Sequence, residues 1–438
     1  MAQPKTQNNF VAIIVMIFLF GMIAFVTNLA SPMGVVLRSQ FTVSNFLGTL
    51  GVFATFIAYA VMGIPGGLLL QRKGYKKTAL IAIAVGFLGV GIQTFSGTIG
   101  TNFAMVVYLA GAFVAGFSMC LLNTVVNPML NTLGGGGNRG NRLIQIGGSF
   151  SSLCGTAVII VVGILIGDIT KARISDVYPV MFIALAIFAL AFVILLLSKI
   201  PEMHSAGHRQ KLPHSPLVFR HFMLGAIGVF IYVGIEVGVQ KALFSFLADW
   251  DLNVLNVATP QAATTIAGFV TATYWFLMLI GRLIGAAIGG KVSPKAMLTF
   301  VSGLGLILVA LAIFLPTSNM LDLPVLMRSP EGTLSFGLAN VPINAAFLVL
   351  TGLCMSVMWG GIFNLAVEGL GKYTEIASGF FMVMVCGGGL LPLLQSFIID
   401  VTDGGYMASY WVIFMGLAYL LYYALIGSKN VNKDIAVE

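Results

Sequence analysis

A single carboxylate lies deep inside an apolar stretch of the chain. Glu236 is near the middle of stretch 218–248, and Tyr232 and Gln240 lie four residues to either side. A helix places residues at this spacing on one face. A carboxyl group held away from water can exchange a proton near neutral pH, and it accepts hydrogen bonds from hydroxyl groups. The stripe therefore predicts a proton-coupling group, a binding group for a hydroxylated ligand, or both. The alternative is a structural ion pair with Lys241 or with a cation of another helix.

Lys241 is a cation in the interior of the same apolar stretch. It follows Glu236 by five residues, so a helix directs it away from that carboxylate. We expect its long side chain to extend outward toward Asp249 and Asp251. For this reason we prefer the functional interpretation of Glu236.

Amide side chains form a second group within the apolar stretches. Asn123 and Asn127 are four residues apart in stretch 103–133, so they share a helical face. Each amide both donates and accepts hydrogen bonds, which suits a polyhydroxylated ligand. Bonding between helices is the alternative. Further polar candidates of the same kind are Asn28, Gln145, Ser149, Asn364 and Gln395.

Two tryptophans lie within apolar stretches rather than near their ends. These are Trp275 and Trp359, whereas Trp250 and Trp411 fall where interfacial tryptophans are usual. An aromatic ring stacks on the apolar C–H face of a sugar, while amides and carboxylates bind its hydroxyl groups. Each residue alone would be ordinary core packing, but the combination predicts a carbohydrate site. The 21 Met and 33 Phe leave open a pocket for amphipathic drugs or lipids.

The elements that carry these residues are apolar stretches of membrane-spanning length. A bilayer core needs about 20 apolar residues per helix, and the chain holds about a dozen such stretches. They lie near 10–37, 43–70, 78–97, 103–133, 142–167, 178–199, 218–248, 262–290, 296–316, 341–369, 377–400 and 405–427. The chain is 58% hydrophobic and 8% charged, whereas soluble domains are about a quarter charged. No large aqueous domain is therefore expected, and no enzyme built on one.

The positive charges indicate orientation. Most of the 22 Lys and Arg fall at the termini and in the gaps after even-numbered stretches. The opposite gaps carry only Arg38, Lys171, Arg173 and Arg328. Because Lys and Arg remain on the cytoplasmic side, both termini are predicted to be cytoplasmic. The same rule explains the net charge of +8 without nucleic acid as a partner.

The chain divides into two similar halves. Residues 1–199 and 218–438 each hold six stretches, and a polar cytoplasmic linker, 200–217, separates them. Each half has a short basic hinge after its second stretch, at 67–77 and at 285–295. A repeated six-span unit is typical of secondary transporters whose halves move about a central site. We predict an all-α membrane protein with twelve transmembrane helices in two pseudo-symmetric six-helix bundles.

Other residues carry fewer implications. The four cysteines fall within apolar stretches without metal-binding spacing, and the histidines near the linker are interpreted as solvated. We therefore expect no cofactor and no metal. Gly387, Gly388 and Gly389, followed by Pro392, should bend their helix because they weaken its hydrogen-bond ladder.

Five segments carry a family resemblance, namely 67–77, 120–128, 232–234, 281–282 and 355–389. Together they resemble the major facilitator superfamily and, within it, the fucose/galactose/glucose–proton symporters. The resemblance covers nearly the whole chain and implies a sugar bound between two bundles. It implies ligand contacts by Asn28, Asn127 and Trp359, and a cytoplasmic gate or signature loop that includes Gly67, Arg72, Gly74, Lys76 and Arg282.

The chain departs from the family at three acidic positions. Gln71 stands in the signature loop, Ser31 in the first stretch and Asn123 in the fourth, where that family has acidic residues. Coupling is therefore expected to run through Glu236 or to be lost.

These observations predict a secondary active transporter of the bacterial inner membrane that imports a sugar by alternating access. The expected coupling ion is H⁺. Na⁺ coupling, uncoupled transport and efflux of amphipathic compounds are the alternatives within transport. A channel or receptor would need a ring of equivalent polar residues, which the sequence lacks. We expect a monomer in the lipid bilayer.

Overall fold

The computed structural model describes residues 7–100, 103–134, 137–166, 171–198, 200, 214–288, 292–328, 334–370 and 373–431. Within these ranges, 12 helices are long and apolar enough to cross a membrane. Their positions follow the predicted stretches, because length and hydropathy are local properties of the sequence. Large apolar side chains such as Leu197, Phe300 and Phe314 are exposed on the outer surface, as a lipid-facing surface requires. The chain is a multi-pass membrane protein.

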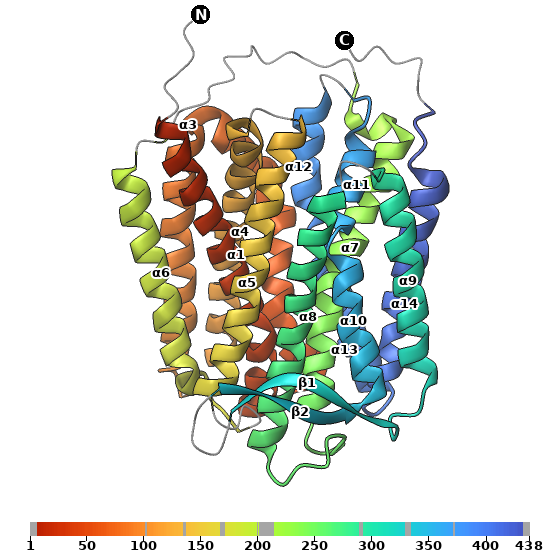
Figure 1. Ribbon diagram of the computed structural model, residues 1–438. Helices are drawn as coiled ribbons and strands as arrows, with labels where there is room; N and C mark the ends of the chain where they lie inside the picture. Colours follow the sequence, from red (N-terminus) through yellow and green to blue (C-terminus); the bar gives the residue numbers. More distant parts are fainter. Residues whose placement is uncertain are drawn as a thin grey trace, which may run out of the picture.

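The first half of the chain forms one group of helices (Figure 1). Its elements are α1 (Gln7–Phe41), the short α2 (Asn45–Gly48), α3 (Leu50–Ser96), α4 (Phe103–Leu133), α5 (Gly137–Leu165), the 3-10 turn η1 (Ile174–Val177) and α6 (Tyr178–Leu197). Helix α3 contains two membrane spans, which meet at a kink at Gly74. The φ of Gly74 is 78°, a conformation that glycine adopts readily and other residues rarely adopt. The turn therefore needs a glycine here.

The second half of the chain forms the other group. Its helices are η2 (Pro216–Val218), α7 (Arg220–Ala248), α8 (Pro260–Ile288), α9 (Pro294–Phe314), α10 (Ile343–Met355), α11 (Met358–Val367), α12 (Thr374–Met384), α13 (Gly387–Val401), α14 (Tyr406–Tyr422) and the π-helical η4 (Tyr423–Gly427). The tenth and eleventh spans are each broken into two helices. The second break, at Val385–Cys386, confirms the bend predicted beside Gly387.

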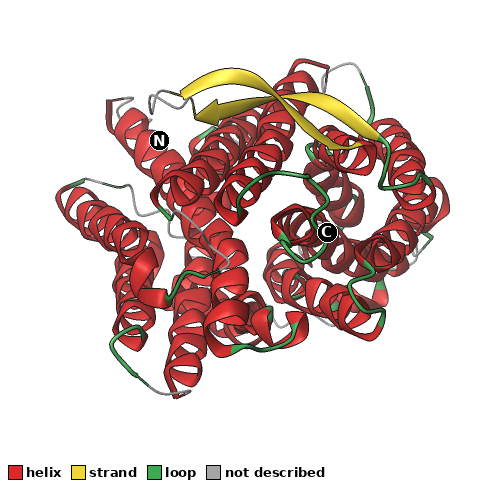
Figure 2. Ribbon diagram, turned by 90° about the horizontal axis from the view of Figure 1, so that it is seen from below, coloured by secondary structure: helices red, strands yellow, loops and turns green. Residues whose placement is uncertain are grey.

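A β-hairpin is the one departure of the described residues from an all-helical fold. Strand β1 (Met320–Arg328) pairs antiparallel with β2 (Leu334–Pro342), with Met320 opposite Pro342. The hairpin lies across one end of the second group, against α8 and α10 (Figures 1 and 2). We call this the hairpin end. The opposite end, where α1 begins and η4 ends, is the terminal end.

The two groups meet along α5 against α8 and along α3 against α12 and α13. Three glycines allow the close approach of α13. A Cβ on Gly387 would overlap the carbonyl oxygen of Phe230 in α7, and one on Gly389 would lie 3.0 Å from the Phe53 Cα in α3. Small residues at such crossings let backbones pack directly. Helix α13 therefore touches both groups.

Candidate functional site

Glu236 lies on α7 and has two side-chain partners. Tyr232 Oη donates a hydrogen bond to Glu236 Oε1 over 2.9 Å, and Arg282 Nη2 of α8 lies 3.6 Å from the same oxygen. The side chain of Glu236 is 15% exposed and that of Arg282 is 13% exposed, so the pair is largely removed from water. The cation that pairs with Glu236 is therefore Arg282 and not Lys241.

Arg282 joins the second group of helices to the first. Its Nη1 donates to the carbonyl oxygen of Gly148 and, over 2.8 Å, to Ser152 Oγ, both on α5. The family resemblance assigned Arg282 to a cytoplasmic gate or signature loop. The structure places Arg282 inside α8, which continues to Ile288. The Arg282 guanidinium is held by a carboxylate, a carbonyl oxygen and a hydroxyl group. A charged side chain inside a membrane span needs such partners, because no bulk water surrounds it.

Trp359 and Gln145 lie beside this pair. The ring centroids of Trp359 (α11) and Tyr232 are 6.1 Å apart. A Cβ on Gly360 would lie 3.2 Å from Gln145 Nε2 of α5, so Gln145 approaches the same part of α11. Ser149 Oγ donates to the Gln145 carbonyl within α5. An indole, a carboxylate and an amide thus meet where the two groups face each other.

Asn28 and Trp275 converge on a second point of α5. A Cβ on Gly155 would lie 3.1 Å from Asn28 Nδ2 of α1 and 3.2 Å from the Trp275 ring of α8. The Asn28 amide also donates to the Ala24 carbonyl over 2.8 Å. Trp275 Nε1 is buried and has no hydrogen-bond partner among the described residues.

One face of α5 carries all of these contacts. Gln145, Gly148, Ser152 and Gly155 are three or four residues apart, so they lie along one side of the helix. Sequence reasoning identified Gln145 and Ser149 on α5 but missed the other three residues. The signal was present in the repeated small residues at helical spacing, which allow another helix to approach closely.

Asn123 and Asn127 form a separate pair on α4. Asn123 Nδ2 donates to Tyr59 Oη of α3 over 2.9 Å and to the Met119 carbonyl over 3.1 Å. Asn127 Nδ2 donates to the Asn123 carbonyl over 3.0 Å. Both side chains are half-buried. Within the described residues no hydrogen bond joins them to Glu236, and the bond to Tyr59 is of the interhelical kind considered as the alternative.

The structure does not bring the remaining candidates to Glu236. Gln395 of α13 is fully buried against Gly238 of α7, where its amide faces the packing between these helices. Gln240 is also buried. Asn364 of α11 has an exposed side chain and forms no hydrogen bond with another candidate in the described part of the chain. The polar pattern identified these residues as intramembrane, but it could not show which way each one points.

The basic hinge has a structural role at the terminal end. Lys76 Nζ donates to the carbonyl oxygens of Leu196 (2.9 Å) and Ser198 (2.7 Å), at the end of α6. A cation there satisfies carbonyl groups that lack partners within the helix. Arg72 is exposed, and Gly67 has open space around its Cα. The side chains of Gln71 and Ser31 lie outside the described residues, as do residues 201–213 of the predicted linker.

A hydrogen-bond network joins the two groups at the hairpin end. Arg38 Nη2 of α1 lies 3.4 Å from Asp249 Oδ2, and Tyr406 Oη donates to the same oxygen over 2.9 Å. The carboxylate of Asp400 in α13 accepts from the backbone N–H groups of Asn45 (2.9 Å) and Phe46 (2.7 Å), at the start of α2. We call these contacts the hairpin-end seal. Those that cross between the two groups connect residues more than 200 positions apart, so no local pattern could predict them.

Lys241 is placed differently from the prediction. Its ammonium donates to Ser396 Oγ of α13 over 2.5 Å, and Ser396 Oγ lies 2.6 Å from Oγ1 of Thr49, the residue before α3. The side chain is buried rather than extended toward the carboxylates that follow α7. Its ammonium is hydrogen-bonded to a hydroxyl group of the neighbouring helix instead.

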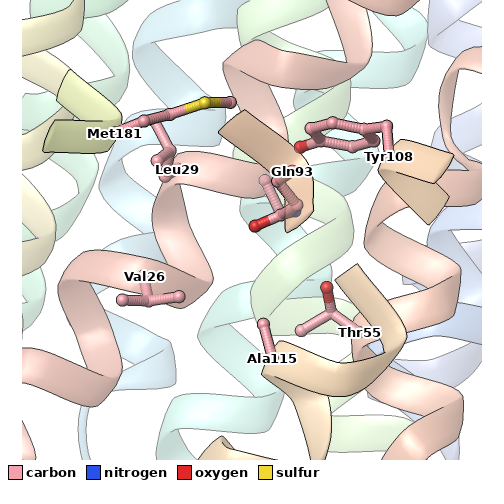
Figure 3. A pocket seen from close by; sticks show the side chains of 8 residues that line it. Val26, Leu29, Thr55, Gln93, Tyr108, Ala115 and Met181 are labelled. Atoms are coloured by element: carbon pink, nitrogen blue, oxygen red, sulfur yellow. The ribbon is translucent and has the colours of Figure 1, made fainter. Parts of the chain in front are cut away.

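A small cavity lies inside the first group of helices (Figure 3). It measures about 10 Å³ and is lined by Thr55, Gln93 and Tyr108 among apolar side chains. That is about the minimum space for one water molecule. The cavity is therefore too small to be a sugar site.

Comparison with known proteins agrees with this architecture. Residues 13–392 match the family model described as the Major Facilitator Superfamily. The glucose/galactose transporter of Brucella abortus is 28% identical, over 98% of this chain and 97% of that protein. The L-fucose-proton symporter of Escherichia coli is 22% identical, over 83% of this chain and 81% of that protein. The crystal structure of the transporter FucP in its outward conformation matches with a TM-score of 0.69 at 19% identity, covering 97% of this chain and all of that one.

The fold and these matches define a membrane transporter and not an enzyme. The chain belongs to the Major Facilitator Superfamily. This confirms the family resemblance and the fold of twelve spans.

Proposed function

We propose that the chain is a secondary active transporter that imports a monosaccharide across the bacterial inner membrane, coupled to H⁺. The names of its relatives, glucose/galactose transporter and L-fucose-proton symporter, support the substrate class and the ion. The distribution of Lys and Arg supports a cytoplasmic terminal end. Each chain holds a complete pathway and works as a monomer. Residues 1–199 and 218–438 act as two bundles that rock about the interface between them.

The chain of contacts from Tyr232 through Glu236 and Arg282 to α5 carries this proposal. Glu236 belongs to the second bundle and Arg282 reaches the first, so the pair lies where the bundles must separate and rejoin. Ionised Glu236 attracts Arg282 away from Ser152. Protonated Glu236 no longer attracts it, and Arg282 is then held by α5 alone. A proton on Glu236 therefore changes how the bundles are joined.

The sugar site is proposed beside this pair. Trp359 offers a ring to the sugar's C–H face, and Gln145 and the Trp275 N–H offer hydrogen bonds. Asn28, Asn123 and Asn127 extend the polar surface on the first bundle. A sugar that touches both sides of the interface would bind best when the bundles close on it. Substrate and proton would thus act on the same contacts.

The test compares two transport assays in liposomes that contain the purified protein. Glu236→Gln removes the titratable proton but keeps a similar shape. We expect the variant to retain exchange of labelled sugar between the two sides and to lose accumulation driven by an inward H⁺ gradient. Glu368→Gln is the matched control, because Glu368 is an exposed carboxylate at the end of α11.

Unchanged accumulation by Glu236→Gln would remove Glu236 as the coupling group. If sugar accumulation by the wild type follows a Na⁺ gradient and not an H⁺ gradient, the coupling ion is Na⁺. If the wild type does not exchange sugar but transports hydrophobic amines, the protein is an efflux carrier and not a sugar importer.

A further inference from the structure

A second cavity opens at the hairpin end, between the two groups of helices. It measures about 270 Å³, and we call it the hairpin-end well. Arg38, Thr49 and Lys171 line it from the first half of the chain, and Lys241, Ser245 and Asp251 from the second. Lys171 and Asp251 are exposed, whereas Thr49, Lys241 and Ser245 are buried. The well therefore runs from a solvated rim to a buried floor.

The floor of the well holds an ammonium group without a carboxylate in contact. Lys241 is 4% exposed, and its Nζ donates a hydrogen bond to the hydroxyl of Ser396. In the described part of the chain no carboxylate oxygen lies within 4.0 Å of its Nζ. Buried charges in proteins are normally paired, and a charged side chain within a membrane span usually serves a ligand pathway. Lys241 faces the well and can receive an anionic partner there.

The carboxylates near the well are already engaged or solvated. Asp249 pairs with Arg38 and accepts from Tyr406. Asp400 does not line the well, and its two oxygens accept from the backbone at the start of α2. Asp251 is exposed at the rim. None of them is placed as a counter-ion in contact with Lys241.

The rest of the lining suits a small hydroxylated molecule. Ser245 follows Lys241 by one helical turn on α7, and Thr49, the residue before α3, also lines the well, so two residues with hydroxyl groups lie near the floor. The half-buried Trp250 adds an aromatic ring nearer the rim. A cavity of about 270 Å³ has room for a molecule of monosaccharide size.

We propose that the hairpin-end well binds a monosaccharide that bears a carboxylate, such as a hexuronate. The carboxylate binds Lys241, the hydroxyl groups bind Ser245 and Thr49, and the ring lies against Trp250. This site is separate from the one beside Glu236, and it contacts both halves of the chain. It adds recognition of acidic sugars to the transport of sugars proposed above.

The test is direct binding of D-glucuronate to the full chain in lipid nanodiscs, measured by titration calorimetry. We expect Lys241→Gln to weaken D-glucuronate binding about tenfold or more, because it removes a charge-assisted hydrogen bond. Arg173→Gln is the control. It removes the same charge from an exposed residue at the hairpin end that does not line the well. Ser245→Leu, which fills the well and keeps every charge, should also abolish binding and serves if Lys241→Gln does not fold.

Three results would overturn the proposal. The first is wild-type protein that does not bind D-glucuronate. The second is equal binding by the wild type, Lys241→Gln and Ser245→Leu. The third is displacement of D-glucuronate by chloride of equal affinity, which would assign the well to a free halide. Glu236→Gln should bind D-glucuronate like the wild type, so failure of the coupling proposal and failure of this one remain distinguishable.

Discussion

Replacing Asp400 by Asn should open the hairpin end of the molecule. The Asp400 carboxylate accepts two backbone hydrogen bonds across the interface, over 2.9 Å and 2.7 Å. Asn offers one acceptor oxygen and no charge, so one bond is lost and the other becomes neutral. Hydrogen bonds to charged groups contribute about 1.5–3 kcal/mol each. Losing that amount from the sealed state shifts the ratio of open to sealed molecules about ten- to hundredfold.

Double electron–electron resonance, which measures the distance between two spin labels, would report this shift. Spin labels placed on exposed residues of the two bundles, as Arg173→Cys and Leu252→Cys, separate when the hairpin end opens. We expect Asp400→Asn to enlarge the long-distance population at the expense of the short one. Asp403→Asn is the matched control, since Asp403 is an exposed carboxylate three residues further on. Equal distance distributions for Asp400→Asn and the control would refute the role given to the hairpin-end seal.

Three further substitutions test individual contacts. Arg282→Lys keeps the charge but cannot bond α5 and the carboxylate at once, so sugar exchange should slow about tenfold while sugar affinity by calorimetry changes less than threefold. Sugar exchange by Arg282→Lys at the wild-type rate would contradict the proposal that Arg282 joins the two bundles. Gly155→Ala adds a Cβ 3.1 Å from an amide nitrogen of α1, so the KM for sugar should rise. Gly303→Ala, which meets open space, should leave it unchanged. Gly74→Ala forces a side chain into a backbone conformation, φ 78° and ψ 173°, that essentially only glycine adopts, so it should destabilise the protein by about 1–3 kcal/mol and lower its Tm. Gly67→Ala, where an added Cβ meets open space, should leave the stability and the Tm unchanged. Equal Tm values for Gly67→Ala and Gly74→Ala would contradict the requirement for glycine at position 74.

The spans could be predicted from the sequence because each is a local signal. An apolar run of sufficient length becomes a membrane helix whatever its neighbours are. The turn at Gly74 and the break beside Gly387 were also local, since both depend on glycine within a few residues. The prediction of Glu236 as an intramembrane carboxylate rested on its position in one stretch.

The partners of these residues could not be predicted in this way. Arg282 lies 46 positions from Glu236 on another helix, so no local pattern could show that the two side chains pair. The hairpin-end seal joins Asp400 to Asn45 across most of the chain. The hairpin itself was missed, since Pro324 lies within β1 and proline argues against a strand.

Proton uptake during sugar transport tests the central claim most directly. In liposomes without an imposed pH gradient, an inward sugar gradient applied to the wild type should acidify the liposome interior, as a pH-sensitive dye would report. We predict that Glu236→Gln carries labelled sugar down the same gradient without the pH change. Acidification by Glu236→Gln equal to that of the wild type would contradict coupling through this carboxylate.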